Sequence, residues 1–233
     1  MEWEERWNRA DMVKATDSCE QVGRTLNGKN YSAEQISILT NRIRDLLQAS
    51  PEKVLLDLAC GNGMMTYRIA PHFKSVKAID FSAPLIQTAR DKFARGNIEY
   101  LVGNAIELDS VREKYDCILV YFAFQYFNPD QARKMFAHFK RLLKPDGRIL
   151  LGEVADGDRV WNFYPGLKGR GRFYFDLLRG EPTIGHWWKP LDLLKLVEEM
   201  GWALTISYQK SDLPAHYFRY DAIIEACASS VSR

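Results

Sequence analysis

The stretch VLLDLACGNGMMT, residues Val54–Thr66, decides how this chain of 233 residues folds. Its opening apolar run predicts a buried strand, Gly61 and Gly63 predict a turn, and MMT begins a helical pattern. Because glycine has no Cβ, the backbone N–H groups of such a turn can approach a ligand closely. The stretch therefore predicts a strand, a ligand-binding turn and a helix in direct succession.

Apolar runs and amphipathic helical patterns alternate along the neighbouring sequence, which is typical of βαβ units around a parallel sheet. Strands are expected at residues 54–59, 75–80, 98–103, 115–122 and 147–154, and helices at 32–48, 81–95, 129–144 and 190–200. Ser32 with Gln35, and Asn128 with Gln131, have the spacing of a helix start. Two alternating runs, 202–209 and 217–226, predict an antiparallel hairpin at one edge of this α/β fold.

Two carboxylates near the glycine turn indicate what the turn binds. Asp80 ends the next expected strand, where it can accept hydrogen bonds from both hydroxyls of a ribose. A dinucleotide fingerprint has a third glycine where this chain has Thr66, and Asp57 would repel a pyrophosphate. Asp57 would instead attract an amino group. The pattern therefore favours an adenosine cofactor that is not a dinucleotide.

The pattern Asp57-x-Ala59-x-Gly61-x-Gly63 resembles the first motif of class I S-adenosylmethionine (SAM) methyltransferases. The resemblance continues through Asp80 and Phe81, and through the runs at 102–108, 115–127 and 142–154, so that it covers about residues 21–226. It implies a mostly parallel, Rossmann-like sheet with an antiparallel last strand. It also implies methyl transfer from SAM, with S-adenosylhomocysteine as product, to an oxygen or nitrogen atom of a small molecule.

Within that family the chain is most similar to the ubiquinone-biosynthesis-like group and to bacterial sugar, polysaccharide and natural-product methyltransferases. Three alternatives stay open. An RNA or protein methyltransferase would need a recognition domain or a basic face, and an NAD-type oxidoreductase would tolerate Asp57 and Thr66 poorly. A SAM-binding module without catalysis would bind the cofactor and transfer nothing.

The resemblance implies that the motif residues bind the cofactor. These are Asp57, Ala59, Cys60, Gly61, Asn62, Gly63, Asp80, Phe81, Asn104, Ala105, Tyr121 and Phe122. Asn104 stands where the family more often has Asp, although an amide can also hydrogen-bond the adenine edge. The run QVGRTLNG, residues 21–28, resembles a segment that covers the cofactor, so Gln21 and Arg24 are candidates to hold the methionine carboxylate. The alternative for Arg24 is a solvated surface residue.

Methyl transfer requires alignment of donor and acceptor, exclusion of water and, for an alcohol acceptor, removal of a proton. Gln125 stands where related enzymes often have a histidine, and a glutamine cannot be the base. The candidate bases are therefore Glu153, His186 and His216; the alternatives are a structural carboxylate and ordinary loop histidines. The residues expected to contact the acceptor are Gln125, Tyr126, Trp187, Trp188, Arg170 and Arg172.

The two arginines belong to the run KGRGR, residues 168–172, and they suggest an anionic acceptor; a solvated loop is the alternative. The formal net charge of only +2 argues against nucleic acid and membrane surfaces as partners, although a local basic patch stays possible. Four widely spaced cysteines predict neither a metal site nor a disulfide framework and favour a reducing cytoplasm.

The expected organisation has four parts. A helical cover at 1–50 precedes a methyltransferase domain at 51–226, in which an irregular substrate lid occupies 156–189, and a tail follows at 227–233. The chain is expected to act as a monomer or a homodimer.

Overall fold

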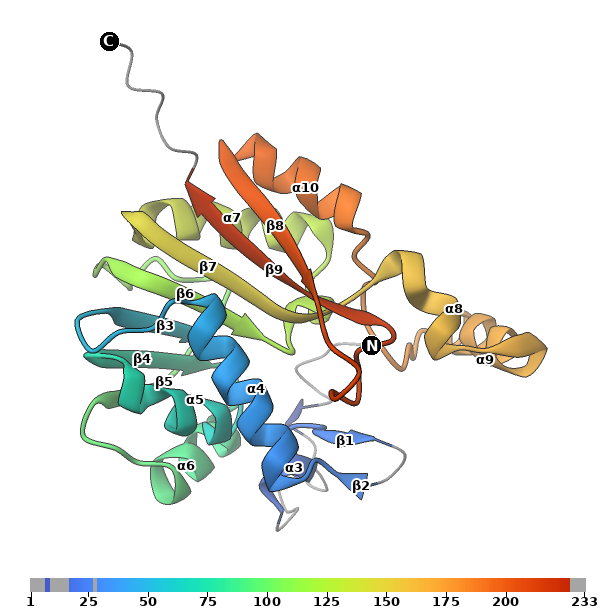
Figure 1. Ribbon diagram of the computed structural model, residues 1–233, viewed down its shortest axis with the longest axis horizontal. Coiled ribbons are helices and arrows are strands. Elements are labelled where there is room, and N and C mark those ends of the chain that lie inside the picture. Colours follow the sequence, from blue (N-terminus) through green and yellow to red (C-terminus); the bar gives the residue numbers. More distant parts are fainter. Residues whose placement is uncertain (1–6, 9–16, 27–28, 227–233) are drawn as a thin grey trace.

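A seven-stranded sheet forms the centre of the computed structural model, which describes residues 7–8, 17–26 and 29–226. The strands lie in the order β5-β4-β3-β6-β7-β9-β8 (Figure 1). Five run parallel: β3 (Val54–Leu58), β4 (Ser75–Asp80), β5 (Ile98–Val102), β6 (Tyr115–Tyr121) and β7 (Leu143–Ala155). The last two, β8 (Trp202–Tyr208) and β9 (Arg219–Ala226), form the expected antiparallel hairpin, and β9 pairs antiparallel with β7.

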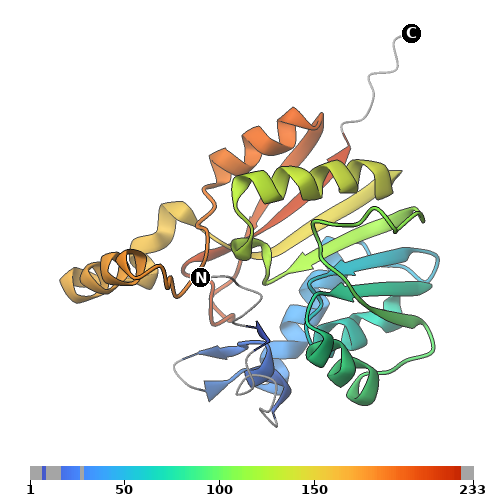
Figure 2. The same cartoon turned by 180° about the vertical axis from the view of Figure 1, so that it is seen from behind.

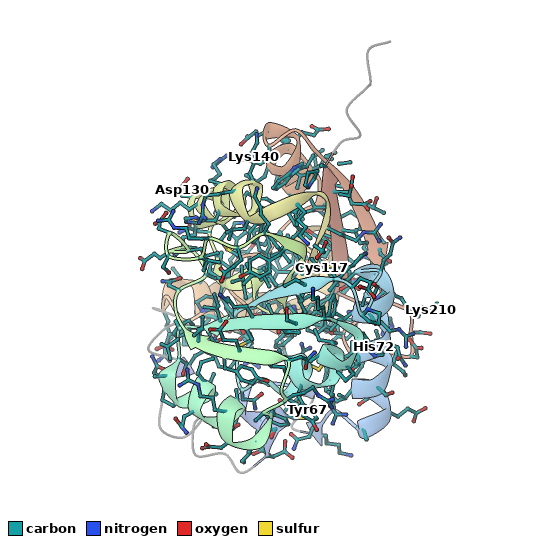
Figure 3. All side chains as sticks on the ribbon, turned by 90° about the vertical axis from the view of Figure 1, so that its left-hand side faces the viewer. Tyr67, His72, Cys117, Asp130, Lys140 and Lys210 are labelled. Atoms are coloured by element: carbon teal, nitrogen blue, oxygen red, sulfur yellow. The ribbon has the colours of Figure 1, made fainter. Side chains whose placement is uncertain are left out.

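Helices cover both faces of the sheet because side chains of successive strand residues point to opposite faces. One face carries α4 (Ala33–Leu46), α5 (Met64–Ile69) and α6 (Ala83–Lys92); the other carries α7 (Pro129–Leu142) and α10 (Pro190–Glu199). Leu55 packs in the apolar core on the face covered by α4, α5 and α6, and its neighbour Leu56 packs in the core on the face covered by α7 and α10. The side chains in Figure 3 fill the layers between helices and sheet, and Cys117 of β6 is completely buried among them.

Both predicted helix starts are confirmed at the level of hydrogen bonds. Gln35 N donates to the Ser32 hydroxyl oxygen at 3.1 Å, and the Gln35 side chain accepts from Ser32 N at 2.9 Å. Asn128 and Gln131 make the same reciprocal pair at the start of α7. A cap of this kind satisfies backbone donors that the first helical turn leaves without partners.

The stretch expected to be irregular, 156–189, is partly helical. It contains the 3-10 turn η3 (Gly157–Arg159) and the helices α8 (Val160–Phe163) and α9 (Gly166–Leu178), which project from the side of the sheet (Figures 1 and 2). The helix α9 was not predicted because its glycines are typical of loops. Gly169 lies there because a Cβ would come within 2.5 Å of the Tyr164 backbone.

The described N-terminal part is not entirely helical. It consists of α3 (Ser18–Gln21), a two-stranded hairpin of β1 (Thr25–Leu26) and β2 (Lys29–Asn30), and then α4. Two further 3-10 turns are η1 (Ala70–His72) and η2 (Phe124–Tyr126). The expected tail, 227–233, lies outside the described residues. Within the described part of the chain, none of the helices has the length and apolar character that crossing a membrane requires.

Candidate functional site

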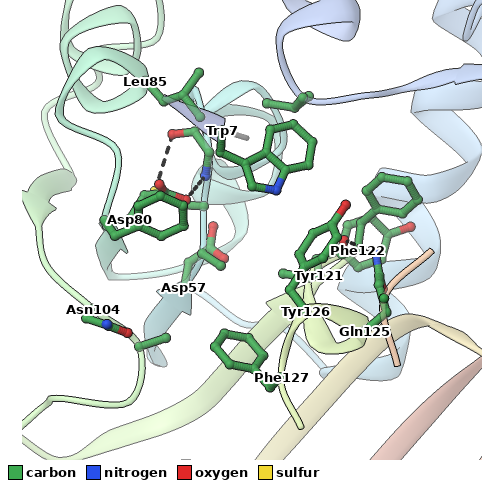
Figure 4. A pocket seen from close by; sticks show the side chains of 18 of the residues that line it. Trp7, Asp57, Asp80, Leu85, Asn104, Tyr121, Phe122, Gln125, Tyr126 and Phe127 are labelled. Atoms are coloured by element: carbon green, nitrogen blue, oxygen red, sulfur yellow. Dashed lines mark hydrogen bonds between the residues drawn. The ribbon is translucent and has the colours of Figure 1, made fainter. Parts of the chain in front are cut away.

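A cavity of about 690 Å³ opens at the carboxyl ends of β3, β4 and β6 (Figure 4). The chain leaves β3 toward β4 and β5 on one side, and returns to β6 and β7 on the other. Such a reversal leaves a crevice between the two central strands, which is where open α/β sheets bind ligands. The N-terminal segment covers the cavity with Trp7, Val22 and Arg24, and the segment after α9 adds His186.

The glycine turn that follows β3 is required by backbone geometry. Gly61 and Gly63 have φ values of +58° and +76°. A Cβ on Gly61 would lie 2.9 Å from the Val22 side chain, and one on Gly63 would lie 2.6 Å from the Tyr100 hydroxyl. Larger residues would therefore displace either the N-terminal cover or the neighbouring strand. With glycine at both positions, the backbone of the turn can approach the cavity.

Asp80 ends β4 at the floor of the cavity, with its carboxylate held in place by two backbone donors. Gly61 N donates to Oδ2 at 2.8 Å, and Ser82 N donates to Oδ1 at 2.9 Å. Burial raises the pKa of Asp80 to about 6, and these two hydrogen bonds oppose the rise. Each oxygen keeps a lone pair for a ligand, which fits the two hydroxyls of a ribose.

Asp57, at the end of β3, is a buried carboxylate that lines the same part of the cavity. Its Oδ2 accepts from the Thr66 hydroxyl at 2.6 Å. Burial raises its pKa to about 7, and the nearby charge of Asp80 adds to this. Among the described residues, neither Asp57 nor Asp80 forms an ion pair with Lys, Arg or His. This half of the cavity therefore favours a ligand that carries positive charge, as both the ammonium and the sulfonium of SAM do.

The opposite half of the cavity is aromatic and follows β6. Tyr121, Phe122 and Tyr126 line it, and Tyr126 packs edge-on against Trp7 with ring centroids 5.6 Å apart. The Gln125 amide donates to Phe122 O at 2.7 Å, so its orientation is fixed within the wall. Aromatic ring faces attract cations and exclude water, which suits a positively charged methyl donor.

Three neighbouring strands have a residue with left-handed backbone at or near their carboxyl ends. Ala59 after β3, Phe122 after β6 and Glu153 in β7 have φ values of +55°, +60° and +54°. Such values are uncommon outside glycine and cost energy, so their clustering at one edge is typical of a functional site. The turn at Glu153 coincides with a register shift between β7 and β9, and the Glu153 N–H donates to Asp221 Oδ1 at 2.7 Å.

Glu153 is not placed as a base for a ligand in the cavity. Its side chain is completely buried, does not line the cavity and forms an ion pair with Arg24. Arg219 donates to the Glu153 carbonyl oxygen from the other side. Arg24 itself is 3% exposed, lies 4.1 Å from the centre of the Phe122 ring and contributes to the cavity wall. The alternative of a solvated Arg24 is therefore wrong.

His186 is the candidate base that the structure brings to the cavity. Its backbone N–H donates to Gln125 O at 2.6 Å, which fixes the segment after α9 against the aromatic wall. Partial burial lowers the pKa of the imidazole below 6.5, partly offset by Asp192. The ring is therefore neutral at pH 7 and able to accept a proton.

Most of the residues predicted to bind the cofactor or the acceptor do line the cavity. Those predicted residues are Arg24, Asp57, Ala59, Cys60, Gly61, Asn62, Asp80, Phe81, Asn104, Ala105, Tyr121, Phe122, Gln125 and Tyr126. Gln21 lies just behind the wall, where its Oε1 accepts from the Asn62 amide at 2.9 Å. Gly63 does not line the cavity; it is the turn residue that immediately precedes α5.

Five other candidates are not gathered at the cavity. Trp188 is a core residue, 2% exposed, whose indole donates to Phe124 O; Trp187 packs with Phe163 and Phe218 in a separate cluster. The His216 ring bonds to Leu213 O at 2.7 Å.

Arg170 and Arg172 lie on α9, where Arg170 packs over Trp161 and Arg172 pairs with Asp176 at 3.6 Å. The sequence predicts them beside an acceptor because a cationic cluster among aromatic residues can bind an anion. Neither side chain lines the cavity, and the helix that carries them projects from the side of the sheet (Figure 1).

Several wall residues gave no usable signal in the sequence. Trp7 precedes any recognisable pattern, and Val22 becomes a wall residue only because the N-terminal segment folds over Gly61. Leu85 and Met65 had the apolar periodicity of ordinary core positions on α6 and α5. Phe127, the last residue of the run 115–127 that carries part of the resemblance, also lines the cavity.

Comparison with known proteins bears on both the fold and the site. Residues 55–147 match a family model described as a methyltransferase domain. The demethylmenaquinone methyltransferase of Thermotoga maritima is 30% identical over 51% of this chain and 53% of its own length. The malonyl-[acyl-carrier protein] O-methyltransferase of Acetivibrio thermocellus is 32% identical over 44% and 38%. The chain thus matches about half or less of the length of these two relatives.

A solved structure extends the similarity across the whole fold. It is that of an S-adenosylmethionine-dependent methyltransferase from Clostridium acetobutylicum, which superposes with a TM-score of 0.66. The superposition covers 89% of this chain and 97% of that one at 14% sequence identity. The Rossmann-like arrangement predicted from the first motif is therefore confirmed, including the antiparallel hairpin at the edge of the sheet.

Proposed function

We propose that this chain, which belongs to the class I SAM-dependent methyltransferases, transfers the methyl group of SAM to an oxygen or nitrogen atom of a small molecule. One observation carries the proposal: a single cavity joins the half lined by Asp57 and Asp80 to the aromatic half that follows β6. Its volume of about 690 Å³ lies within the range of roughly 300 to 1,000 Å³ that is typical of small-molecule sites.

The residues at the first half fit the cofactor's polar groups. Asp80 is placed to accept hydrogen bonds from the ribose hydroxyls, and Asp57 to attract the ammonium group of the methionine part. Arg24, which lines the wall, keeps donors beyond the one that Glu153 uses and can bind the methionine carboxylate. Asn104 and Ala105 border the space for the adenine. When bound, SAM supplies an electrophilic methyl group on its sulfonium.

The residues at the second half would align the acceptor and keep water out. Tyr121, Phe122 and Tyr126 offer ring faces to the cationic centre. His186, neutral at pH 7, would accept the proton that an alcohol or ammonium acceptor must lose. These rings exclude water, which would otherwise compete with the acceptor. Alignment of the methyl donor with the acceptor would then supply most of the rate enhancement.

The cavity limits the size and position of the acceptor and does not indicate its charge. An anionic acceptor was expected from Arg170 and Arg172, and their location on α9 removes that support. The two relatives are named for acceptors as different as demethylmenaquinone and malonyl-[acyl-carrier protein], so their names do not select an acceptor here.

Calorimetry tests the cofactor half of the proposal. SAM and S-adenosylhomocysteine should bind and NADH should not. Asp80→Ala should weaken binding of both by at least about 100-fold, because two charge-assisted hydrogen bonds are lost. Asp109→Ala, at an exposed position in the loop that follows β5, is the matched control and should bind normally. Binding of NADH would refute the assignment.

Transfer of labelled methyl groups tests the acceptor half. The chain is incubated with radiolabelled SAM and fractionated small-metabolite extracts, and label should appear in a low-molecular-mass product. Label in RNA or protein fractions alone would contradict a small acceptor. Cofactor binding without transfer to any fraction would instead support a SAM-binding module without catalysis.

A further inference from the structure

The helix α9 presents an apolar surface that the described structure leaves largely exposed. Leu167 and Leu178 are 87% and 88% exposed, and Tyr174 and Phe175 are 56% and 57% exposed. With 3.6 residues per turn, Leu167, Tyr174 and Leu178 fall on one side of the helix and Phe175 beside them. We call Leu167, Tyr174, Phe175 and Leu178 the arm surface.

The opposite side of α9 is the one that packs. Phe173 contacts Trp161 and Tyr164, with ring centroids 5.4 and 5.2 Å apart, and Gly169 lies against the Tyr164 backbone. The helix is thus held to α8 by one side, and Figures 1 and 2 show the pair projecting from the body of the fold. The arm surface therefore faces away from Trp161 and Tyr164, on the side of α9 that does not pack against α8.

Basic side chains border the arm surface along both of its edges. Lys168, Arg172 and Arg179 fall along one edge of the helix, and Arg170 along the other. All four are exposed; Arg172 pairs at 3.6 Å with Asp176, which lies on the packed side, and Arg179 pairs at 3.2 Å with Glu181. Counting residues 166–181, four basic residues less two acidic residues give +2, as much as the formal charge of the whole chain. The local basic patch that the sequence left possible lies on this helix.

An apolar stripe bordered by cations matches the surface of an anionic lipid layer. Apolar side chains of such a helix enter the boundary of the acyl chains, while Lys and Arg stay at the head groups. A second copy of the chain fits less well, because a symmetric contact between two arms would bring their cations together. We infer that α9 docks on an anionic lipid surface, lying in its plane rather than crossing it.

Docking would also orient the cavity. The segment that follows α9 contributes Pro182, Gly185 and His186 to the cavity wall, so the arm and the cavity's rim are only a few residues apart. A chain bound through the arm surface would hold this rim near the lipid. An amphiphilic acceptor that resides in the layer could then reach the methyl donor. This consequence rests on the proposed function, whereas the docking itself does not.

Co-sedimentation with vesicles tests the inference. The full chain should sediment with vesicles of equal parts phosphatidylglycerol and phosphatidylcholine, and not with pure phosphatidylcholine, at about 0.1 M salt. Lys168→Gln with Arg179→Gln should weaken binding about thirtyfold, since each removes one cation from the surface. Leu167→Ser with Leu178→Ser should weaken it at least about tenfold for each leucine.

Matched controls are available on α10. Leu191 is 59% exposed and Lys195 is also exposed, so Leu191→Ser and Lys195→Gln change the same residue types away from the arm. Both controls should sediment like the parent chain. Binding of S-adenosylhomocysteine, measured on every variant, should be unchanged, because none of the substituted residues lines the cavity.

Three outcomes would overturn the inference. The first is absence of sedimentation, and the second is equal binding to both kinds of vesicle. The third is a dimer, detected by light scattering, that the leucine substitutions convert to a monomer, since that would make a second copy the partner of the arm. A chain that sediments as expected but does not bind S-adenosylhomocysteine would support the docking and refute the proposed function.

Discussion

The buried carboxylate of Asp57 serves the site and lowers the stability of the fold. Burial raises its pKa to about 7 from an ordinary value of 3.8. Between these two values the folded chain binds more protons than the unfolded chain, so the free energy of unfolding falls as the pH rises through this window. A bound cation would relieve that cost, which ties the penalty to ligand binding.

Asp57→Asn should therefore stabilise the fold while weakening SAM binding. At pH 8 we expect the free energy of unfolding to rise by about 2 to 4 kcal/mol, because the buried charge is gone. The gain should shrink to near zero at pH 4, and SAM affinity should fall. Urea unfolding at both pH values, with Asp109→Asn as control, measures the first effect. An equal gain at pH 4 and pH 8 would show that the charge is not its source.

His186 gives a prediction about rate rather than stability. Its pKa lies below 6.5, so the parent enzyme should lose kcat as the pH falls through that region and the ring becomes protonated. His186→Gln should lower kcat by about 100-fold to 10,000-fold and remove this acid limb. The assay uses saturating SAM so that titration of Asp57 does not contribute. His72→Gln, on η1, is the control; an acid limb that survives in His186→Gln would refute the role.

At the scale of elements, the ion pair between Arg24 and Glu153 joins the N-terminal hairpin to β7. Glu153→Gln would leave Arg24 buried without its ion-pair partner and remove a nearby negative charge from the buried Arg219, and we expect it to cost about 3 to 5 kcal/mol in unfolding free energy. Arg24→Gln should cost less when Glu153 is already replaced, which a double-mutant cycle in urea would reveal. The exposed pair of Arg133 with Glu199 should show a coupling below about 1 kcal/mol.

The elements predicted from the sequence are those whose signals are local. Ser32 with Gln35 and the alternation in 202–226 depend on neighbours a few residues apart, and the structure has the corresponding helix start and hairpin. The first motif likewise carried Asp57 and the glycine turn within thirteen residues. The helix α9 was missed because its glycines, which suit close packing on Tyr164, look like loop residues.

What could not be predicted depends on contacts between distant residues. Glu153 pairs with Arg24, 129 positions away, and this pairing turns a candidate base into a structural carboxylate. Trp7 reaches the cavity only because the N-terminal segment folds over Gly61. Spacing along the chain indicates which residues share an element, whereas the role of a titratable side chain depends on which other elements pack around it.

In the molecule as a whole, the N-terminal segment forms one wall of the cavity. It is held by hydrogen bonds from the Asn62 amide to Ser18 O and to the Gln21 side chain, at 2.8 and 2.9 Å, and by the ion pair of Arg24. We expect a layer held by so few contacts to open and close during turnover. A ligand that contacts Val22 and Arg24 binds the closed state better and shifts the balance toward it.

Hydrogen exchange measures that shift. S-adenosylhomocysteine at 100 times its dissociation constant should stabilise the whole fold by about 2.7 kcal/mol. Beyond this uniform effect, exchange of the amides in 18–26 should slow further, because their opening now requires loss of the ligand. Amides of α10, which contributes no residue to the cavity wall, should show the uniform effect alone. Equal slowing in both segments would mean that the N-terminal segment stays closed without ligand, and that entry occurs past the segment at 181–186 instead.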